Sequence, residues 1–85
     1  MRKTNKEKNV EVWTTYDLGV SAALLCDGFK LLSIDKTNQK KALFVFRKEV
    51  GIDDTANDYF ADKLKLNTRK YFDQLKALKN RLYSE

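Results

Sequence analysis

Residues 29–47 read FKLLSIDKTNQKKALFVFR and place a polar segment between two apolar ones. The apolar segments are 29–34 and 42–47, and the residues between them, 35–40, are rich in turn formers. Two such segments joined by a short polar loop most simply form an antiparallel hairpin. Both alternating faces of 42–47 are apolar, which indicates a central strand with helices on one face and a cover on the other.

The chain before this hairpin predicts a strand and a helix. Segment 10–14 alternates and is a short predicted strand, whereas 16–27 has the apolar spacing of a helix. Thr15 is a suitable N-cap, and Gly28 suits the left-handed position after a helix end. Residues 1–9 are polar and basic without an apolar period, so we expect a flexible basic tail.

Two further helices are predicted after the hairpin. The first spans 54–64 with Asp53 as its cap, and its inward-facing residues are Ala56, Tyr59, Phe60 and Leu64. The second spans 67–83 with Asn67 as its cap. The predicted order is β-α-β-β-α-α. Residues 10–85 should therefore form one small α+β domain, with a three-stranded antiparallel sheet packed by helices.

The composition is that of a small globular domain. Of 85 residues, 42% are hydrophobic and 34% are charged, so a core is possible and disorder is not expected. The single cysteine, Cys26, excludes an internal disulfide; we expect a small buried hydrophobe in a reducing cytoplasm. The apolar run 18–26 is too short to span a membrane and lacks the features of a signal peptide, so we expect no membrane partner.

Catalysis and metal binding are not indicated. The chain has no histidine and no phosphate-binding loop, so we expect neither an enzyme nor a cofactor or small-molecule substrate. Aspartates recur on the second predicted helix at Asp54, Asp58 and Asp62, next to Asp53. They could supply oxygen ligands to a cation, but they lack the tight turn of a calcium loop. We expect a solvated acidic face and no metal site; pairing with the basic last helix is an alternative.

The last predicted helix combines an apolar stripe with a basic surface. Tyr71, Leu75, Leu78 and Leu82 recur at helical spacing and should pack on the core. Residues 63–85 carry seven basic and two acidic residues. The candidate nucleic-acid-binding residues are Arg69, Lys70, Lys76, Lys79, Asn80 and Arg81, with Tyr83 and the basic tail as possible additional contacts. The alternative interpretation is an ordinary solvated helix face.

Segment 40–48, KKALFVFRK, allows a second interpretation as a nucleic-acid surface. A basic, aromatic strand in a β-α-β-β order resembles the RNA-recognition motif, whose aromatic rings stack on bases. That motif has a Gly or Ala between its aromatics and a fourth strand, and this chain has neither feature. We therefore expect Phe44 and Phe46 in the core.

Seven short segments between Trp13 and Tyr83 carry a family resemblance. They are TYDL at 15–18, AALL at 22–25, GFKLL at 28–32, ALFVF at 42–46, YF at 59–60, YFD at 71–73 and LKNRLY at 78–83. Together they are similar to a family of short uncharacterised domains from bacteria and their phages. The resemblance implies a compact bacterial or phage-encoded domain, and its polar cluster is Lys79, Asn80 and Arg81. It implies no activity.

Two functions follow as competing hypotheses. The first is an accessory protein that binds DNA or RNA through the last helix. The second is a protein-interaction module or homodimer, in which the acidic helix of one copy faces the basic helix of another. Exposure of Trp13, Phe44 or Phe46 on a sheet face would favour the second.

Overall fold

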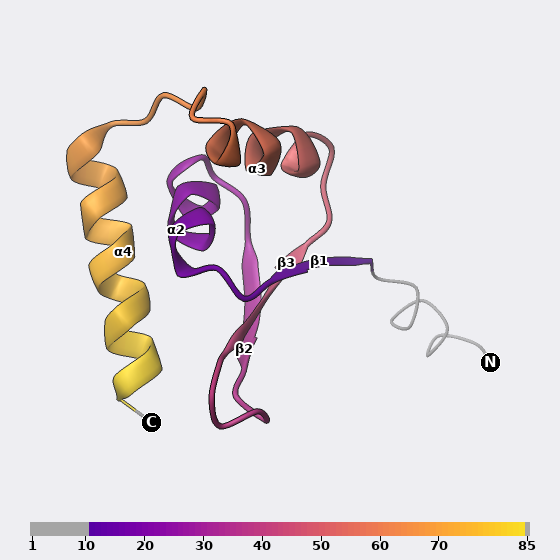
Figure 1. Ribbon diagram of the computed structural model, residues 1–85, viewed down its shortest axis with the longest axis vertical. Coiled ribbons are helices and arrows are strands. Elements are labelled where there is room, and N and C mark those ends of the chain that lie inside the picture. The colour runs from indigo at the N-terminus through magenta and orange to yellow at the C-terminus, as the bar shows by residue number, and fades with distance from the viewer. Residues whose placement is uncertain (1–10, 85) are drawn as a thin grey trace.

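The computed structural model describes residues 11–84. In chain order the elements are β1 (Val12–Thr15), α2 (Leu18–Cys26), β2 (Leu31–Asp35), β3 (Leu43–Arg47), α3 (Ile52–Phe60) and α4 (Thr68–Tyr83). The strands form one antiparallel sheet; α2 and α4 lie to one side of it, and α3 lies across one end (Figure 1). The predicted α+β class and β-α-β-β-α-α order are confirmed. The tail predicted at 1–9 lies outside the described residues.

β3 is the central strand, because the sheet order is β1-β3-β2. It pairs antiparallel with β2, which confirms the predicted hairpin, and also with β1. Phe44 and Phe46 of β3 are fully buried under the helices. Trp13 is in register with Phe46 and meets it edge-on, with ring centroids 6.3 Å apart. Both phenylalanines belong to the core, as predicted.

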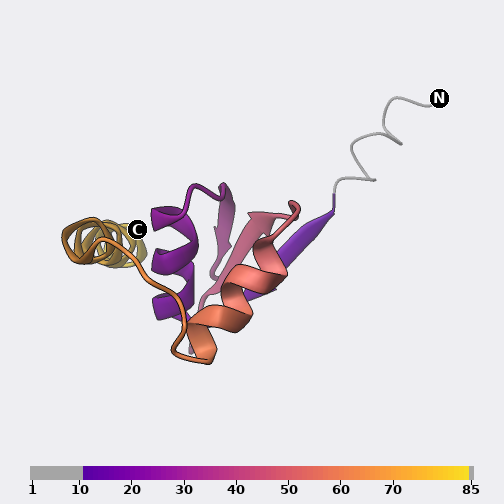
Figure 2. The ribbon, with the colours of Figure 1, turned by 90° about the horizontal axis from the view of Figure 1, so that it is seen from above.

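The second face of the sheet is different. Val12, Leu43 and Val45 alternate with the buried residues, and no helix of residues 11–84 covers them (Figure 2). Val12 is 46% exposed, and Leu32, at an irregularity in the pairing of β2, is 48% exposed. The predicted cover on this face is therefore not found within the described chain.

α2 lies between the sheet and α4 (Figure 2). Residues 20–24 of this helix are all completely buried. A helix that is covered on opposite sides must be apolar all round rather than along one stripe, which explains the sequence LGVSAALLC. The hydroxyl of the buried Ser21 donates a hydrogen bond to the Asp17 carbonyl oxygen at 2.8 Å, so this buried donor is satisfied. Cys26 is only half-buried, less than predicted.

The predicted apolar stripe of α4 faces α2. All its members belong to the core or pack against it: Tyr71, Leu75, Leu78 and Leu82. The Tyr71 hydroxyl donates a hydrogen bond to the Gly19 carbonyl oxygen at 3.2 Å. A Cβ atom at Gly19 would collide with the Tyr59 hydroxyl. Gly19 therefore lets tyrosines from α3 and α4 approach the backbone of α2 closely.

The N-caps of the first two helices differ from the prediction. Asp17, and not Thr15, caps α2, because Asp17 Oδ1 accepts a hydrogen bond from the Val20 N–H at 2.8 Å. Thr15 Oγ1 instead accepts from the Asp17 N–H. Gly51, at φ 93°, precedes α3, which places the predicted cap Asp53 inside the first turn. The predicted caps Asn67 and Gly28 are confirmed.

α3 ends at Phe60, before the predicted end at 64. Asp62 adopts φ 63°, and the Lys63 N–H donates to the Asp58 carbonyl oxygen at 2.8 Å. This is the left-handed helix ending that Gly28 also makes, but here it occurs without the glycine that normally signals it. Phe60, the last residue of α3, was predicted to face inward but is exposed beside Tyr59.

Candidate nucleic-acid interface

All six predicted interface residues are exposed on α4. They are Arg69, Lys70, Lys76, Lys79, Asn80 and Arg81. Helical spacing places Arg69, Lys76 and Asn80 along the side opposite the buried stripe, whereas Lys79 lies on one flank and Lys70 and Arg81 lie on the other. The helix thus displays the cations around its whole outer surface rather than in one compact patch.

A row of aromatic and basic side chains runs along one flank of α4. Phe72, Lys76, Lys79 and Tyr83 occur at i, i+4, i+7 and i+11, one residue later than the buried stripe; we call them the aromatic–basic row. Phe72 is 53% exposed and Tyr83 is 81% exposed. Phe72 was missed by the sequence analysis, although its spacing from Lys76 and Lys79 was a usable signal. Exposed rings beside cations are typical of surfaces that bind single-stranded nucleic acid.

The cations of α4 are not neutralised by the acidic helix. Among residues 11–84, the ion pair recorded on α4 joins Arg69 Nε to Asp73 Oδ1 at 3.7 Å, and both side chains are exposed. Such a surface pair contributes little to stability. Lys76 Nζ lies 5.5 Å from the centroid of the Phe72 ring. No ion pair in the described chain links α3 to α4, so the predicted alternative of intramolecular pairing is not found.

The aspartates of α3 either contact residues outside α4 or face solvent. Asp53 accepts a hydrogen bond from Trp13 Nε1 at 2.8 Å and lies 3.6 Å from Lys48 Nζ. Asp54 and Asp58 are exposed. In residues 11–84, no group of three or more His, Cys, Asp or Glu side chains is placed to hold a metal ion.

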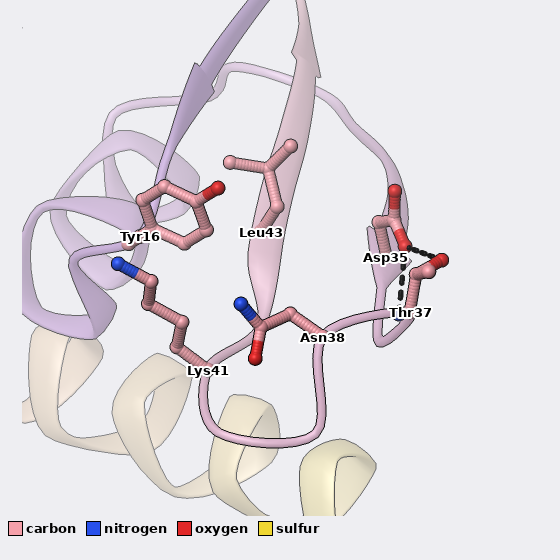
Figure 3. Close-up of a pocket in the computed structure, with 6 residues that line it drawn as sticks. All are labelled: Tyr16, Asp35, Thr37, Asn38, Lys41 and Leu43. Atoms are coloured by element: carbon pink, nitrogen blue, oxygen red, sulfur yellow. Dashed lines mark hydrogen bonds between the residues drawn. The ribbon is translucent and has the colours of Figure 1, made fainter.

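A shallow hollow of about 270 Å³ opens at the loop end of the sheet (Figure 3). Its lining residues are Tyr16, Asp35, Thr37, Asn38, Lys41 and Leu43. Lys41 Nζ sits 4.4 Å from the centroid of the Tyr16 ring. Hydrogen bonds from the Thr37 hydroxyl and N–H lower the pKa of Asp35. The charged groups of this hollow thus already have partners within the protein.

Tyr71 is the second of the described residues, after Asp35, with a clearly shifted pKa. Burial raises the pKa of Tyr71 to about 12, and its contact with the Tyr59 hydroxyl adds to the rise. A shifted pKa in an open cleft can mark a reactive site, but Tyr71 lies in the packing between α4 and α2. Its role is structural.

The chain belongs to a family described as a domain of unknown function (DUF5659), whose model matches residues 10–84. No curated protein and no solved structure matches the chain significantly. The matched residues include the whole span, Trp13 to Tyr83, in which the sequence resembled a family of uncharacterised domains, and this resemblance is confirmed. Within residues 11–84, no helix is both long enough and apolar enough to cross a bilayer.

Proposed function

We propose that this domain is an accessory nucleic-acid-binding protein that contacts phosphates through the outer surface of α4. The observation that carries the proposal is the exposure of Lys70, Lys76, Lys79 and Arg81 without a carboxylate partner among the described residues. Cations that are already solvated and unpaired can meet phosphate groups without first breaking an internal ion pair. Each phosphate contact releases counterions, so binding should weaken steeply with salt.

The overall charge supports the same partner. The chain has a formal net charge of +5, and its acidic residues concentrate on α3 and the turn before it rather than on α4. This asymmetry orients the molecule so that α4 leads towards a polyanion. We place the protein in the cytoplasm of a bacterium or a phage-infected cell, where nucleic acid is accessible. This placement rests on the family resemblance and on the single unpaired cysteine.

The test is fluorescence anisotropy with labelled DNA and RNA over a series of salt concentrations. The K76E/K79E/R81E triple variant should lose at least tenfold in affinity at low salt. Removing three contacts should also reduce the slope of log K against log salt by about 2–3. The matched control is K30E/K63E/K65E, which makes the same charge change at exposed positions outside α4. Absence of binding by the wild type, or an equal loss in the control, contradicts the proposal.

The uncovered sheet face favours a second candidate, a protein-interaction or homodimerising domain. The rings expected to mark such a surface are not on it, because Phe44 and Phe46 are buried and Trp13 is half-buried on the helix side. The surface instead sets the aliphatic side chains of Val12 and Val45 beside the polar ones of Arg47 and Thr14, which lie opposite them in the pairing of β1 with β3. Light scattering over a dilution series tests this candidate: a monomer at every concentration, unchanged by V12K, argues against self-association.

A further inference from the structure

The loop of the β2–β3 hairpin is held against the end of α4. Lys36 Nζ donates hydrogen bonds to the carbonyl oxygens of Arg81 at 3.3 Å and Leu82 at 2.9 Å. A cation at this position also complements the negative end of the helix dipole. Figure 1 shows the hairpin tip and the last turn of α4 at the same end of the molecule. Two basic segments far apart in the sequence thus form one surface.

A hollow of about 230 Å³ lies where these segments meet. Its lining residues are Lys36, Asn38, Gln39, Lys40, Lys41, Ala42, Leu82 and Tyr83. None of them is acidic. They combine cations, carboxamide groups and an exposed aromatic ring, which are the groups that recognise phosphates, base edges and base faces respectively.

The loop is already ordered for binding. Asn38 Oδ1 accepts a hydrogen bond from the Lys40 N–H at 2.8 Å, and Asp35 Oδ1 accepts one from the Thr37 N–H at 2.9 Å. These bonds hold the loop backbone at Thr37 and Lys40. Part of the loop backbone is therefore held in place before a ligand binds.

We propose that this hollow binds one nucleotide of a single-stranded nucleic acid, with the base on the Tyr83 ring and its phosphate beside Lys40. Lys41, whose ammonium group lies over the Tyr16 ring, lines both this hollow and the neighbouring one. It would contact the phosphate of the adjacent nucleotide. The inference rests on the proposed function and names the form of nucleic acid. A base paired inside a duplex cannot offer its face to Tyr83, whereas an unstacked base can.

The remaining strand has a path along α4. From Tyr83 the aromatic–basic row continues through Lys79 and Lys76 to Phe72, about 16 Å away at the helical rise per residue. Phe72 offers a second exposed ring at the far end. The row thus places two cations between two exposed rings, and the hollow adds further cations beyond Tyr83, which suits the phosphates and bases of a single strand.

The experiment compares a labelled single-stranded oligonucleotide with its duplex by anisotropy at low salt. The wild type should prefer the single strand. Y83A and K40Q/K41Q should each weaken single-strand binding about tenfold, whereas Y83F should bind like the wild type because it keeps the ring. K63Q/K65Q is the matched charge control. Circular dichroism checks folding, and Tyr83 is exposed enough for its truncation to be tolerated.

Photocrosslinking supplies a direct readout of contact. A strand containing 5-iodouracil should crosslink to Tyr83, mapped by mass spectrometry, and not to Phe60, an exposed ring on α3. If the wild type binds no nucleic acid, the proposed function and the hollow both fail. If K76E/K79E/R81E abolishes binding but Y83A and K40Q/K41Q do not change it, α4 binds and the hollow does not. Equal affinity for duplex and single strand, or no crosslink at Tyr83, also overturns the inference.

Discussion

Burial constrains the sequences of helices α2 and α4 to very different degrees. α2 is covered by the sheet on one side and by α4 on the other, and five consecutive residues in it are completely buried. α4 is covered on one side only, and most of its outer residues are charged or polar. Packing therefore dictates nearly every position of α2, whereas half of α4 is available for binding. The difference predicts where substitutions should damage the fold and where they should damage only function.

The largest effect is expected for Leu24→Ala in α2. Leu24 is completely buried in the middle layer, so the truncation leaves a cavity that neighbours on both sides would have to fill. The free energy of unfolding should fall by about 2–5 kcal/mol, measured by urea denaturation. Phe72→Ala on the outside of α4 is the matched comparison and should cost far less. Similar losses in the two variants would contradict the layered arrangement.

Gly19→Ala should be the next most damaging change. The added methyl group collides with the Tyr59 hydroxyl, and this should outweigh the better helix propensity of alanine. We expect a loss of about 1–3 kcal/mol in the free energy of unfolding. Because the closest atom is the hydroxyl oxygen, Y59F should partly rescue the variant in a double-mutant cycle. Strict additivity of the two changes would show that Tyr59 does not cause the damage.

Alkaline pH offers a smaller test of the contact between α2 and α4. Burial raises the pKa of Tyr71 from 10.0 to about 12, so the folded protein holds this proton more tightly than the unfolded chain does. The stability contribution is complete below pH 10 and is lost as pH rises towards 12. After allowance for partial exposure the loss is about 1–2 kcal/mol. Y71F should show a flatter decline between these pH values; an identical decline would contradict the shift.

The sequence predicted the order and the buried faces of the elements better than it predicted where the helices begin and end. The two apolar faces of 42–47 and the apolar spacing in 67–83 correctly identified β3 as central and the inner stripe of α4, although the cover expected on the second sheet face is not found within residues 11–84. These features succeed because burial acts on every second residue of a strand and on every third or fourth residue of a helix. The end of α3 was missed because Asp62 takes a left-handed conformation for which glycine is the usual signal.

Only the part of the candidate interface that lies on α4 was predicted from the sequence. The cations of α4 were found from local spacing, because residues on one helix face need no tertiary information. The approach of the hairpin loop to α4 depends on Lys36 reaching carbonyl groups 45 and 46 residues away. No periodic pattern in the sequence encodes that contact. The hollow between them therefore emerges only from the three-dimensional arrangement.

The smallest effect on stability is expected at the exposed lysines that are proposed to bind nucleic acid. Lys76→Ala and Lys79→Ala remove exposed side chains that make no ion pair within residues 11–84, and alanine is a slightly better helix former than lysine. Each variant should change the free energy of unfolding by less than about 0.5 kcal/mol. Each should nevertheless lower the salt dependence of nucleic-acid binding by about one phosphate contact. A variant that loses stability and keeps its binding would show that these lysines serve the fold, and it would remove the distinction between the two helices.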